Sequence, residues 1–136
     1  MLPEREKQQI VKLLMKKVQP AFIVLFGSYA KGTAREDSDV DLAYYSEEKL
    51  NGYNRFILAG NLAEICGTEV DVVNIRDVDT VFAMQIFEGG RPLAIMDADE
   101  YTKQKIKAYR MYATLMEQRQ PIIESIQSRG SVYGDE

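Results

Sequence analysis

The chain has 136 residues, of which 46% are hydrophobic and 28% charged, and its formal net charge at pH 7 is -4. This size and composition predict one globular domain, 1–136, without a separate substrate-binding module. The sequence has no histidine and one cysteine, which excludes Ser-His and Cys-His nucleophiles and most zinc sites. The acidic balance argues against binding an extended nucleic-acid backbone, so the chemistry has to come from carboxylates, Lys, Tyr or Ser.

Targeting signals are not evident in the sequence. Residues 1–7 carry charges where a signal peptide would have its apolar run. No stretch approaches the ~18 consecutive apolar residues that predict a membrane span. We therefore expect a cytoplasmic protein that does not cross a membrane, and we expect Cys66, in the apolar stretch 62–66, to be an ordinary core residue.

The first part of the chain predicts a helix followed by two strands. Apolar residues at helical spacing follow Pro3, and Pro20 closes this helix. Residues 21–26 are all apolar and include several strand formers, which predicts a buried strand. Residues 27–38 are small and polar and predict a loop with room for one helical turn, after which 40–45 predict a second strand.

The middle of the chain continues this alternation of helices and strands. Residues 51–65 suit a helix that ends at Gly67, because glycine readily adopts the left-handed conformation of a helix C-cap. A third strand is expected over 69–75 and a short helix over 78–88, which stops at two glycines. Residues 91–96 predict a fourth strand.

The C-terminal part predicts one long helix or two over 99–127. Pro121 removes an internal hydrogen bond, so we expect a kink or a fresh start there. Residues 128–136 have two glycines and little apolar content, which is typical of a frayed tail. Six apolar residues fall near one stripe of this helix: Tyr101, Ala108, Tyr112, Leu115, Ile122 and Ile126.

Two aspartates at the start of the second strand indicate a metal site. Asp39 and Asp41 are two apart, so on a strand their side chains share one face, with Cα atoms roughly 6.6 Å apart at ~3.3 Å per residue. From that separation two carboxylates can converge on a pair of ions ~3.5–4 Å apart, the spacing of two-metal phosphoryl-transfer sites. Val40 and Leu42 then point the other way, into the core.

The third predicted strand contains one acid, Asp71, within an apolar run. An unpaired carboxylate there would be costly, unless it lies beside Asp39 and Asp41 and shares their metal. Three clustered carboxylates repel one another and resist ionisation unless a cation compensates them. We therefore expect two bound Mg²⁺ ions, or Mn²⁺, both of which prefer oxygen ligands.

A glycine and a serine directly after the first strand predict a phosphate site. Gly27 lets a triphosphate approach the backbone, and the amides that follow form a concavity for anions. The Ser28 hydroxyl can donate to a β- or γ-phosphate oxygen, while Lys31 and Arg35 can supply positive charge to a leaving pyrophosphate. With the acids, this arrangement predicts nucleotide transfer from a nucleoside triphosphate such as ATP.

Each of these features also has an ordinary structural interpretation. A glycine and a serine after a strand usually form only a turn, two aspartates can lie on an exposed face, Asp71 can be an edge-strand acid, and a loop cation is usually solvated. Their joint occurrence at these positions is expected by chance on the order of once in several hundred chains of this length. We therefore favour the functional interpretation.

The residues 26–34, with Gly27 and Ser28, and the residues 38–42, with Asp39 and Asp41, resemble the signature of the DNA polymerase β-like nucleotidyltransferase superfamily. The resemblance runs from about residue 20 to 75. Within the superfamily the chain is most similar to the minimal nucleotidyltransferase branch and to MntA-type antitoxins of HEPN/MNT toxin–antitoxin systems. That similarity rests on the length, Asp71, the stretch 87–93 and the long C-terminal helix. The family usually has Arg at position 31, where Lys31 keeps the charge but loses bidentate binding.

The resemblance implies an α/β (α+β) fold with a mixed, mostly antiparallel sheet flanked by helices. It also implies Mg²⁺-dependent transfer of AMP from ATP to a tyrosine of a partner, a HEPN-family toxin (a HepT-like RNase), which is thereby silenced. Gly27 and Ser28 would bind phosphate, Asp39 and Asp41 would hold both ions, and Asp71 would complete one site and help to deprotonate the acceptor.

Two alternatives stay open at this point. The acceptor can be a small-molecule hydroxyl, such as that of an aminoglycoside, although nothing in the loops indicates a sugar pocket. The protein can also be a stoichiometric binding antitoxin that does not need its catalysis. In that case the long helix from Asp99 onward would be the main contact with the toxin.

Overall fold

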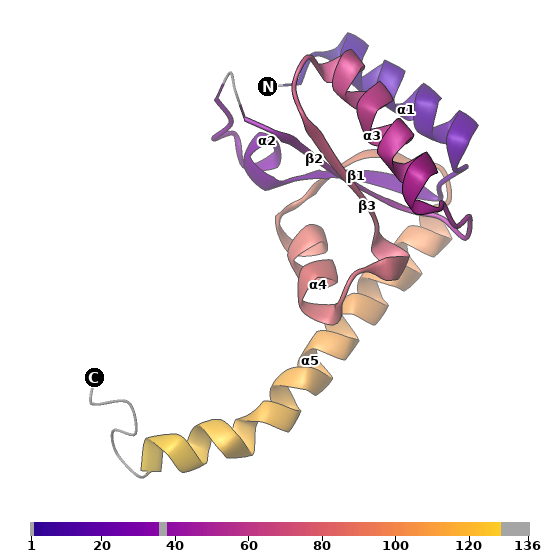
Figure 1. Ribbon diagram of the computed structural model, residues 1–136. Helices are drawn as coiled ribbons and strands as arrows, with labels where there is room; N and C mark the ends of the chain where they lie inside the picture. Colours follow the sequence, from indigo (N-terminus) through magenta and orange to yellow (C-terminus); the bar gives the residue numbers. More distant parts are fainter. Residues whose placement is uncertain (1, 36–37, 129–136) are drawn as a thin grey trace.

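The computed structural model describes the backbone of residues 2–35 and 38–128 and, in that part, the side chains as far as Gln118. The helices are α1 (Glu4–Lys17), α2 (Gly27–Lys31), α3 (Gly52–Cys66), α4 (Thr80–Gly89) and α5 (Ala98–Ser128), with a short 3-10 helix η1 (Ile75–Asp77). The strands are β1 (Phe22–Phe26), β2 (Val40–Tyr45), β3 (Val70–Asn74) and β4 (Arg91–Ile95). Figure 1 shows α1 and α3 side by side over one face of the sheet, with α4 and α5 on the other side.

The four strands form one mixed sheet in the order β3-β2-β1-β4. Strand β1 pairs antiparallel with both β2 and β4, and β2 pairs parallel with β3. The chain reaches β3 from β2 through α3, because a parallel neighbour requires a crossover. This mostly antiparallel sheet, flanked by helices, confirms the predicted fold class.

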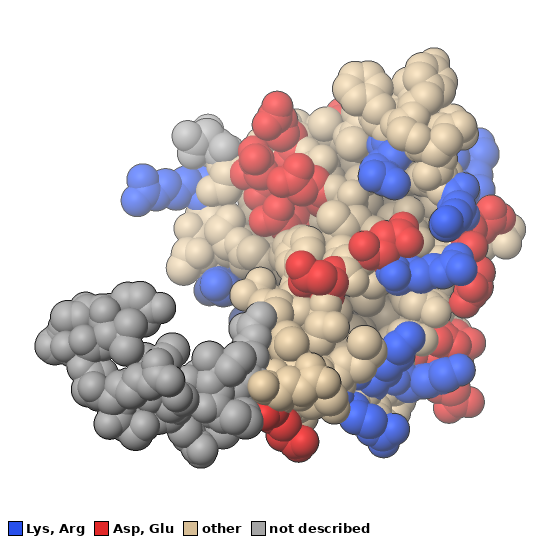
Figure 2. Space-filling view, turned by 60° about the horizontal axis from the view of Figure 1, so that its bottom comes forward, with Lys and Arg blue, Asp and Glu red and all other residues tan. Residues whose placement is uncertain are grey.

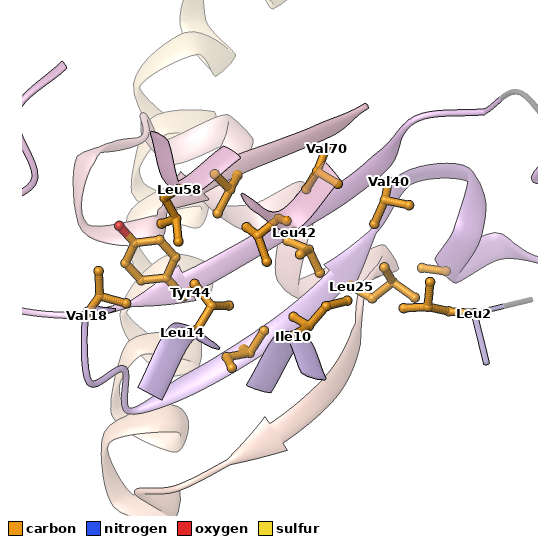
Figure 3. Packing of buried hydrophobic residues seen from close by; sticks show 14 residues of the cluster. Leu2, Ile10, Leu14, Val18, Leu25, Val40, Leu42, Tyr44, Leu58 and Val70 are labelled. Atoms are coloured by element: carbon orange, nitrogen blue, oxygen red, sulfur yellow. The ribbon is translucent and has the colours of Figure 1, made fainter. Parts of the chain in front are cut away.

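The first face of the sheet carries a continuous apolar core beneath α1 and α3. Val40, Leu42 and Tyr44 alternate along β2 and point toward these helices, where Leu14 of α1 and Leu58 of α3 meet them (Figure 3). The side chains of Leu14 and Leu42 are completely buried. Strand alternation therefore directs the even-numbered residues of β2 into this core.

The second face carries a smaller core built from aromatic rings. Phe22 of β1 stacks on Tyr45 of β2 at 5.9 Å between ring centroids and meets Tyr101 of α5 edge-on at 5.0 Å. Phe87 of α4 lies 5.9 Å from both Phe22 and Tyr101. These contacts join α4 and the first turns of α5 to one end of the sheet, and Asp41 and Asp71 lie on the same face at its other end.

Helix α5 begins one residue earlier than the sequence predicts, at Ala98, where the Asp97 carboxylate accepts a hydrogen bond of 3.0 Å from the amide of Glu100. It runs to Ser128 as one helix, which decides between the two alternatives expected for this segment and excludes a fresh start at Pro121. A proline removes one helix hydrogen bond but has a helical φ, which lets a helix bend rather than break. Figure 1 shows the axis bending toward the last turns.

The predicted apolar stripe of α5 is seen as far as the side chains are described. Ala108 is buried, and Tyr101, Tyr112 and Leu115 are half-buried. Ile122 and Ile126 lie beyond the described side chains, and the predicted frayed tail lies outside the described residues, apart from Ser128 at the end of α5. None of the described helices is both long and apolar enough to cross a membrane.

Candidate active site

The predicted site residues meet at one end of the sheet. Strand β1 ends at Phe26, next to the start of β2, because these two strands are antiparallel and Phe26 pairs with Asp41. Strand β3 starts at the same end because it is parallel to β2, and its Asp71 pairs with Asp41. The pairing therefore brings Gly27, Asp41 and Asp71 together from separate parts of the sequence.

Asp41 is the central acid of this group. It is partly buried on β2, and burial is the main cause that raises the pKa of its carboxyl group above the usual value. The negative charges of Asp71 and Asp39 raise this pKa further, as does a hydrogen bond with the Asp71 carboxyl group. Without a cation, the carboxyl group of Asp41 therefore binds a proton more readily than that of an ordinary aspartate.

Asp39 lies outside the strands that carry the other two acids. It comes just before β2 begins, and its side chain is exposed, as is that of Asp71. Asp39 is near enough to raise the pKa of Asp41, but among the described residues no three acidic or cysteine side chains are grouped so that they can hold a metal ion as they stand. A three-carboxylate site therefore requires exposed side chains of this group to turn toward Asp41.

Gly27 is required by both its conformation and its surroundings. Its φ of +72° lies in the left-handed region that favours glycine. A Cβ atom here would overlap the Asp41 carboxylate oxygen and lie 3.0 Å from its Cγ atom. The absence of a side chain at Gly27 therefore allows the turn after β1 to lie directly against the central acid.

Ser28 lies in the first turn of the short helix α2. Its carbonyl oxygen accepts the backbone N–H of Gly32, which caps the helix, and that of Thr33 at 3.0 Å. These bonds hold the turn between β1 and the loop that leads to the acids. The half-buried Ser28 is thereby placed one residue after the glycine that contacts Asp41.

A groove of about 700 Å³ begins at Gly27 and Lys31 and runs between α2, α4 and α5. Phe26, Phe82 and Tyr112 line it with aromatic rings. The Tyr109 hydroxyl donates a 3.0 Å hydrogen bond to Glu88 and so joins α5 to α4 at its wall. Phe82 and Tyr112 were missed by the sequence analysis, since nothing in their local sequence brings α4 and α5 to Gly27.

Arg35 lies apart from this groove. Its backbone N–H donates to the Ser38 hydroxyl at 2.7 Å, and its side chain is exposed. Lys31 lines the groove and Arg35 does not. Of the two cations predicted to meet a pyrophosphate, only Lys31 is therefore next to Gly27 in this structure.

The side chains present suit a hard divalent cation. Asp39, Asp41 and Asp71 offer only carboxylate oxygens, the ligands that Mg²⁺ and Mn²⁺ prefer. The raised pKa of Asp41 beside Asp71 and Asp39 marks the place where positive charge would relieve the repulsion between the carboxylates. Figure 2 shows one large patch of acidic side chains, with further acidic and basic side chains scattered over the same face. The donor set therefore fits the metal, although its side chains have to move closer together to hold it.

A glycine turn after a strand, facing carboxylates on two adjacent strands, suits metal-assisted chemistry on the phosphates of a nucleotide. The family model described as "Polymerase beta, Nucleotidyltransferase" matches residues 8–100 of the chain. This match covers more than half of the sequence and includes Gly27, Asp41 and Asp71. The chain belongs to this family, and it is a nucleotidyltransferase.

Two curated relatives of this chain are protein adenylyltransferases. The protein adenylyltransferase MntA of Shewanella oneidensis is 32% identical over 126 residues, which cover 92% of this chain and 90% of the relative. A second protein adenylyltransferase MntA, from Aphanizomenon flos-aquae, is 32% identical over 103 residues, or 68% of this chain and 69% of the relative. The similarity thus extends beyond the motif residues.

Solved structures of toxin–antitoxin complexes show the same fold. A chain in the crystal structure of a toxin–antitoxin with AMP-PNP superposes with a TM-score of 0.78 and 33% identity, covering 89% of this chain and 98% of that one. A chain of the complex between a tri-AMPylated Shewanella oneidensis HEPN toxin and its MNT antitoxin has a TM-score of 0.75 and 29% identity. That match covers 91% of this chain and 98% of the other. The resemblance proposed from the sequence is confirmed.

Proposed function

We propose that this nucleotidyltransferase is a protein adenylyltransferase, which transfers AMP from ATP to a tyrosine of a partner HEPN-family RNase toxin and silences it. The observation that carries the proposal is the Asp41–Asp71 pair, which adjoins a side-chain-free turn at Gly27 and a large groove. The names of the relatives support AMP as the transferred group and a toxin as the acceptor. We further propose that residues 1–136 act as one domain, in the cytoplasm.

The triphosphate would lie along the turn after β1. Gly27 admits the phosphates close to the backbone, and the Ser28 hydroxyl donates to a β- or γ-phosphate oxygen. Lys31, which lines the groove, would supply positive charge to the leaving pyrophosphate. The nucleoside would extend into the groove, where Phe82 and Tyr112 offer aromatic surfaces to the base. Arg35 would reach the phosphates only if its loop moved.

The acids would hold two Mg²⁺ ions and handle the proton of the acceptor. Asp39 and Asp41 would bind both ions, and Asp71 would complete one of the two sites. Bound Mg²⁺ would supply positive charge for the triphosphate and lower the pKa of the acceptor hydroxyl. The bond between the tyrosine oxygen and the α-phosphorus forms as the bond from that phosphorus to the bridging oxygen breaks. Pyrophosphate leaves, and the phenolic proton passes to Asp71.

The test is whether neutralisation is catalytic. The toxin is incubated with a substoichiometric amount of this protein, ATP and Mg²⁺, and its mass and RNase activity are then measured. We expect a gain of one or more AMP units per toxin and loss of RNase activity, because a covalent product persists after the proteins separate. The same mixture with EDTA in place of Mg²⁺ should leave the toxin unmodified.

Two outcomes would contradict the proposal. If inhibition requires equimolar protein, persists without ATP and leaves the mass of the toxin unchanged, the protein is a stoichiometric binding antitoxin. If the toxin is untouched but an aminoglycoside gains AMP, the acceptor is a small molecule.

A further inference from the structure

The groove that begins at Gly27 and Lys31 has an acid on its wall. Glu88 of α4 lines this groove, and no cation pairs with it among the side chains that the structure describes. A carboxylate beside the place of a triphosphate repels the phosphates. Glu88 is therefore expected to meet another part of the nucleotide, and the groups there that can donate a hydrogen bond to it are an amino group of the base and the ribose hydroxyls.

The carboxylate of Glu88 is held from the neighbouring helix. The Tyr109 hydroxyl of α5 donates to Glu88 Oε2 at 3.0 Å. Partial burial, the hydrogen bond and the charge of Glu88 raise the pKa of Tyr109 above its usual value, so the phenol stays protonated at neutral pH and remains the donor. This bond engages one carboxylate oxygen and leaves Oε1 to accept a hydrogen bond from a ligand.

Gln85 lies one turn before Glu88 on α4 and lines the same groove. Residues at i and i+3 are neighbours on one face of a helix, with ~5–6 Å between their Cβ atoms, and both side chains are exposed. A carboxylate only accepts hydrogen bonds, whereas an amide can donate them through its nitrogen. The two side chains therefore present an acceptor and a donor next to each other.

Aromatic rings in the groove favour the base over the ribose as the group that Glu88 meets. Phe82 of α4 meets Phe26 edge-on at 5.7 Å between ring centroids, and both rings line the groove together with Tyr112. A base that stacks on an aromatic ring keeps its edge available for hydrogen bonds, which is how proteins recognise unpaired bases. A base stacked here would therefore have its edge within the same groove as Gln85 and Glu88.

We infer that Glu88 selects adenine by accepting a hydrogen bond from its 6-amino group while Gln85 donates to ring nitrogen N1, and that Tyr109 is the residue that positions the Glu88 carboxylate. This inference rests on the proposed function, since it names what would select the base of the nucleotide. Adenine has a donor and an acceptor side by side on this edge, which complement the two side chains of α4. Guanine has the acceptor O6 in place of the amino group, so that two acceptors would meet at Glu88.

The hydrogen bond from Tyr109 also disfavours guanine in another orientation. An unrestrained carboxylate can accept the N1–H and the 2-amino group of guanine together, one on each oxygen. That arrangement needs both oxygens of Glu88, and Oε2 is already bonded to Tyr109. The side chain of Tyr109 is not among those that line the groove, so Tyr109 affects selectivity through Glu88.

The test measures nucleotide binding to the full chain by calorimetry with Mg²⁺ and no partner. The ligands are the α,β-methylene analogues of ATP, of GTP and of purine riboside triphosphate, in which the bond that transfer would break is blocked. The purine riboside compound differs from the ATP analogue only by lacking the 6-amino group. We expect the wild type to bind the ATP analogue about tenfold more tightly than the other two, because a site with a hydrogen-bonding partner rejects a base that lacks the matching group.

The variant E88Q should reverse this preference. Tyr109 can still donate to the oxygen of the new amide, which turns the NH₂ group toward the base. Binding of the ATP analogue should weaken about tenfold, and binding of the GTP analogue, whose O6 can accept from the NH₂ group, should strengthen. The purine riboside analogue should bind nearly as it does to the wild type.

The variant Y109F tests the positioning role. It should lower the preference for the ATP analogue over the purine riboside analogue several-fold, since Glu88 is no longer held. General damage to the groove would weaken all three analogues by the same factor and leave the preference unchanged. The matched controls are Y53F and E64Q, the same two exchanges at exposed positions of α3, and both should bind all three analogues like the wild type.

Three outcomes would overturn the inference. The first is a wild type that binds the ATP and purine riboside analogues equally. The second is an E88Q variant that weakens all three analogues by one factor, as a contact with the ribose would. The third is a Y109F variant with the preference of the wild type. AMP labelling of the toxin tests the proposed function separately: if the toxin gains no AMP while E88Q still reverses the preference, the proposed function fails and the assignment of the base site remains.

Discussion

The two faces of the sheet use the same strands for opposite purposes. On β2, Val40 and Leu42 point toward α1 and α3 and are fully buried, while Asp41 between them points to the other face. On β3, Val70 and Val72 enter the first core and Asp71 lies opposite. One face is a closed apolar layer, and the other is open at the end where the acids meet. Strand alternation thus lets one sheet pack an apolar core on one side and present acids on the other.

The stability of the two faces should differ accordingly. The core of the α1–α3 face consists of buried apolar side chains with partly buried apolar ones packed around them. The α4–α5 face places like charges beside one another, and burial of Asp41 adds to the cost. Variants at adjacent positions of β2 can therefore separate folding from catalysis.

The largest effect is expected for Asp41→Asn on the open face. It should reduce nucleotide transfer on the order of 10³-fold or more, since it removes an acid that would hold both ions. The melting temperature in EDTA should be unchanged or higher. The pKa of Asp41 is raised in the folded state, so its charge opposes folding at neutral pH, and the neutral side chain removes that penalty.

This prediction is checked by radiolabel transfer and by thermal unfolding with and without Mg²⁺. The wild type should gain thermal stability when Mg²⁺ is added, and the Asn variant should gain little. Transfer by the Asn variant at the wild-type rate would show that Asp41 is not a metal ligand.

Leu42→Ala, at the next position of β2, should lower stability and largely preserve nucleotide transfer. Leu42 is completely buried under α1 and α3, so its truncation should lower the free energy of unfolding by about 2–5 kcal/mol. At a temperature where the variant is still folded, its transfer rate should stay within a few fold of the wild type. Urea denaturation and single-turnover labelling measure the two effects. A loss of transfer without a loss of stability would contradict the division between the faces.

The smallest effect is expected for Gly27→Ala, a substitution that should affect both stability and nucleotide transfer. The left-handed backbone costs a non-glycine residue about 1–2 kcal/mol, and the new methyl group would push against Asp41. We expect a loss of stability of this size and a lower transfer rate, because the central acid is displaced. The matched control is Gly60→Ala on α3, where a Cβ atom meets nothing within 4 Å.

The stability of the Gly60→Ala control should change in the opposite direction. An alanine in place of an exposed glycine within a helix should raise stability by about 0.5–1 kcal/mol and leave transfer unchanged. If Gly27→Ala and Gly60→Ala change the free energy of unfolding equally, the overlap of the new methyl group with Asp41 is relieved without loss of stability.

Local patterns in the sequence were sufficient to predict most of the fold. The run 21–26 and the alternation of acids and aliphatic residues at 39–42 correctly identify β1 and β2 and the two faces of β2. Gly67 was predicted to end α3 in the left-handed conformation, and its φ is positive. These features are predictable because they depend on neighbouring residues with a period of two or on the backbone freedom of glycine.

Features that depend on distant segments were predicted less well. Asp71 was expected beside Asp39 and Asp41, and its pairing with Asp41 agrees with that, but the sequence did not indicate that Asp39 would stay exposed. Arg35 was grouped with Lys31 because both lie in one loop, yet only Lys31 lines the groove. Proximity along a loop does not determine the direction of a side chain when a helix such as α2 forms within it.

The sequence by itself determined the candidate residues for the chemistry: the turn at Gly27 and Ser28 and the acids at the start of β2 and on β3, since strand period and residue type depend on local order. Only the tertiary structure decided how these residues are enclosed. It brought Phe82 of α4 and Tyr112 of α5 to Gly27 to form one groove. It also turned Lys105 inward and Lys107 outward on the same helix. The reason is physical: which side of a helix is covered depends on the elements that pack against it, and α4 and the sheet cover only one side of α5.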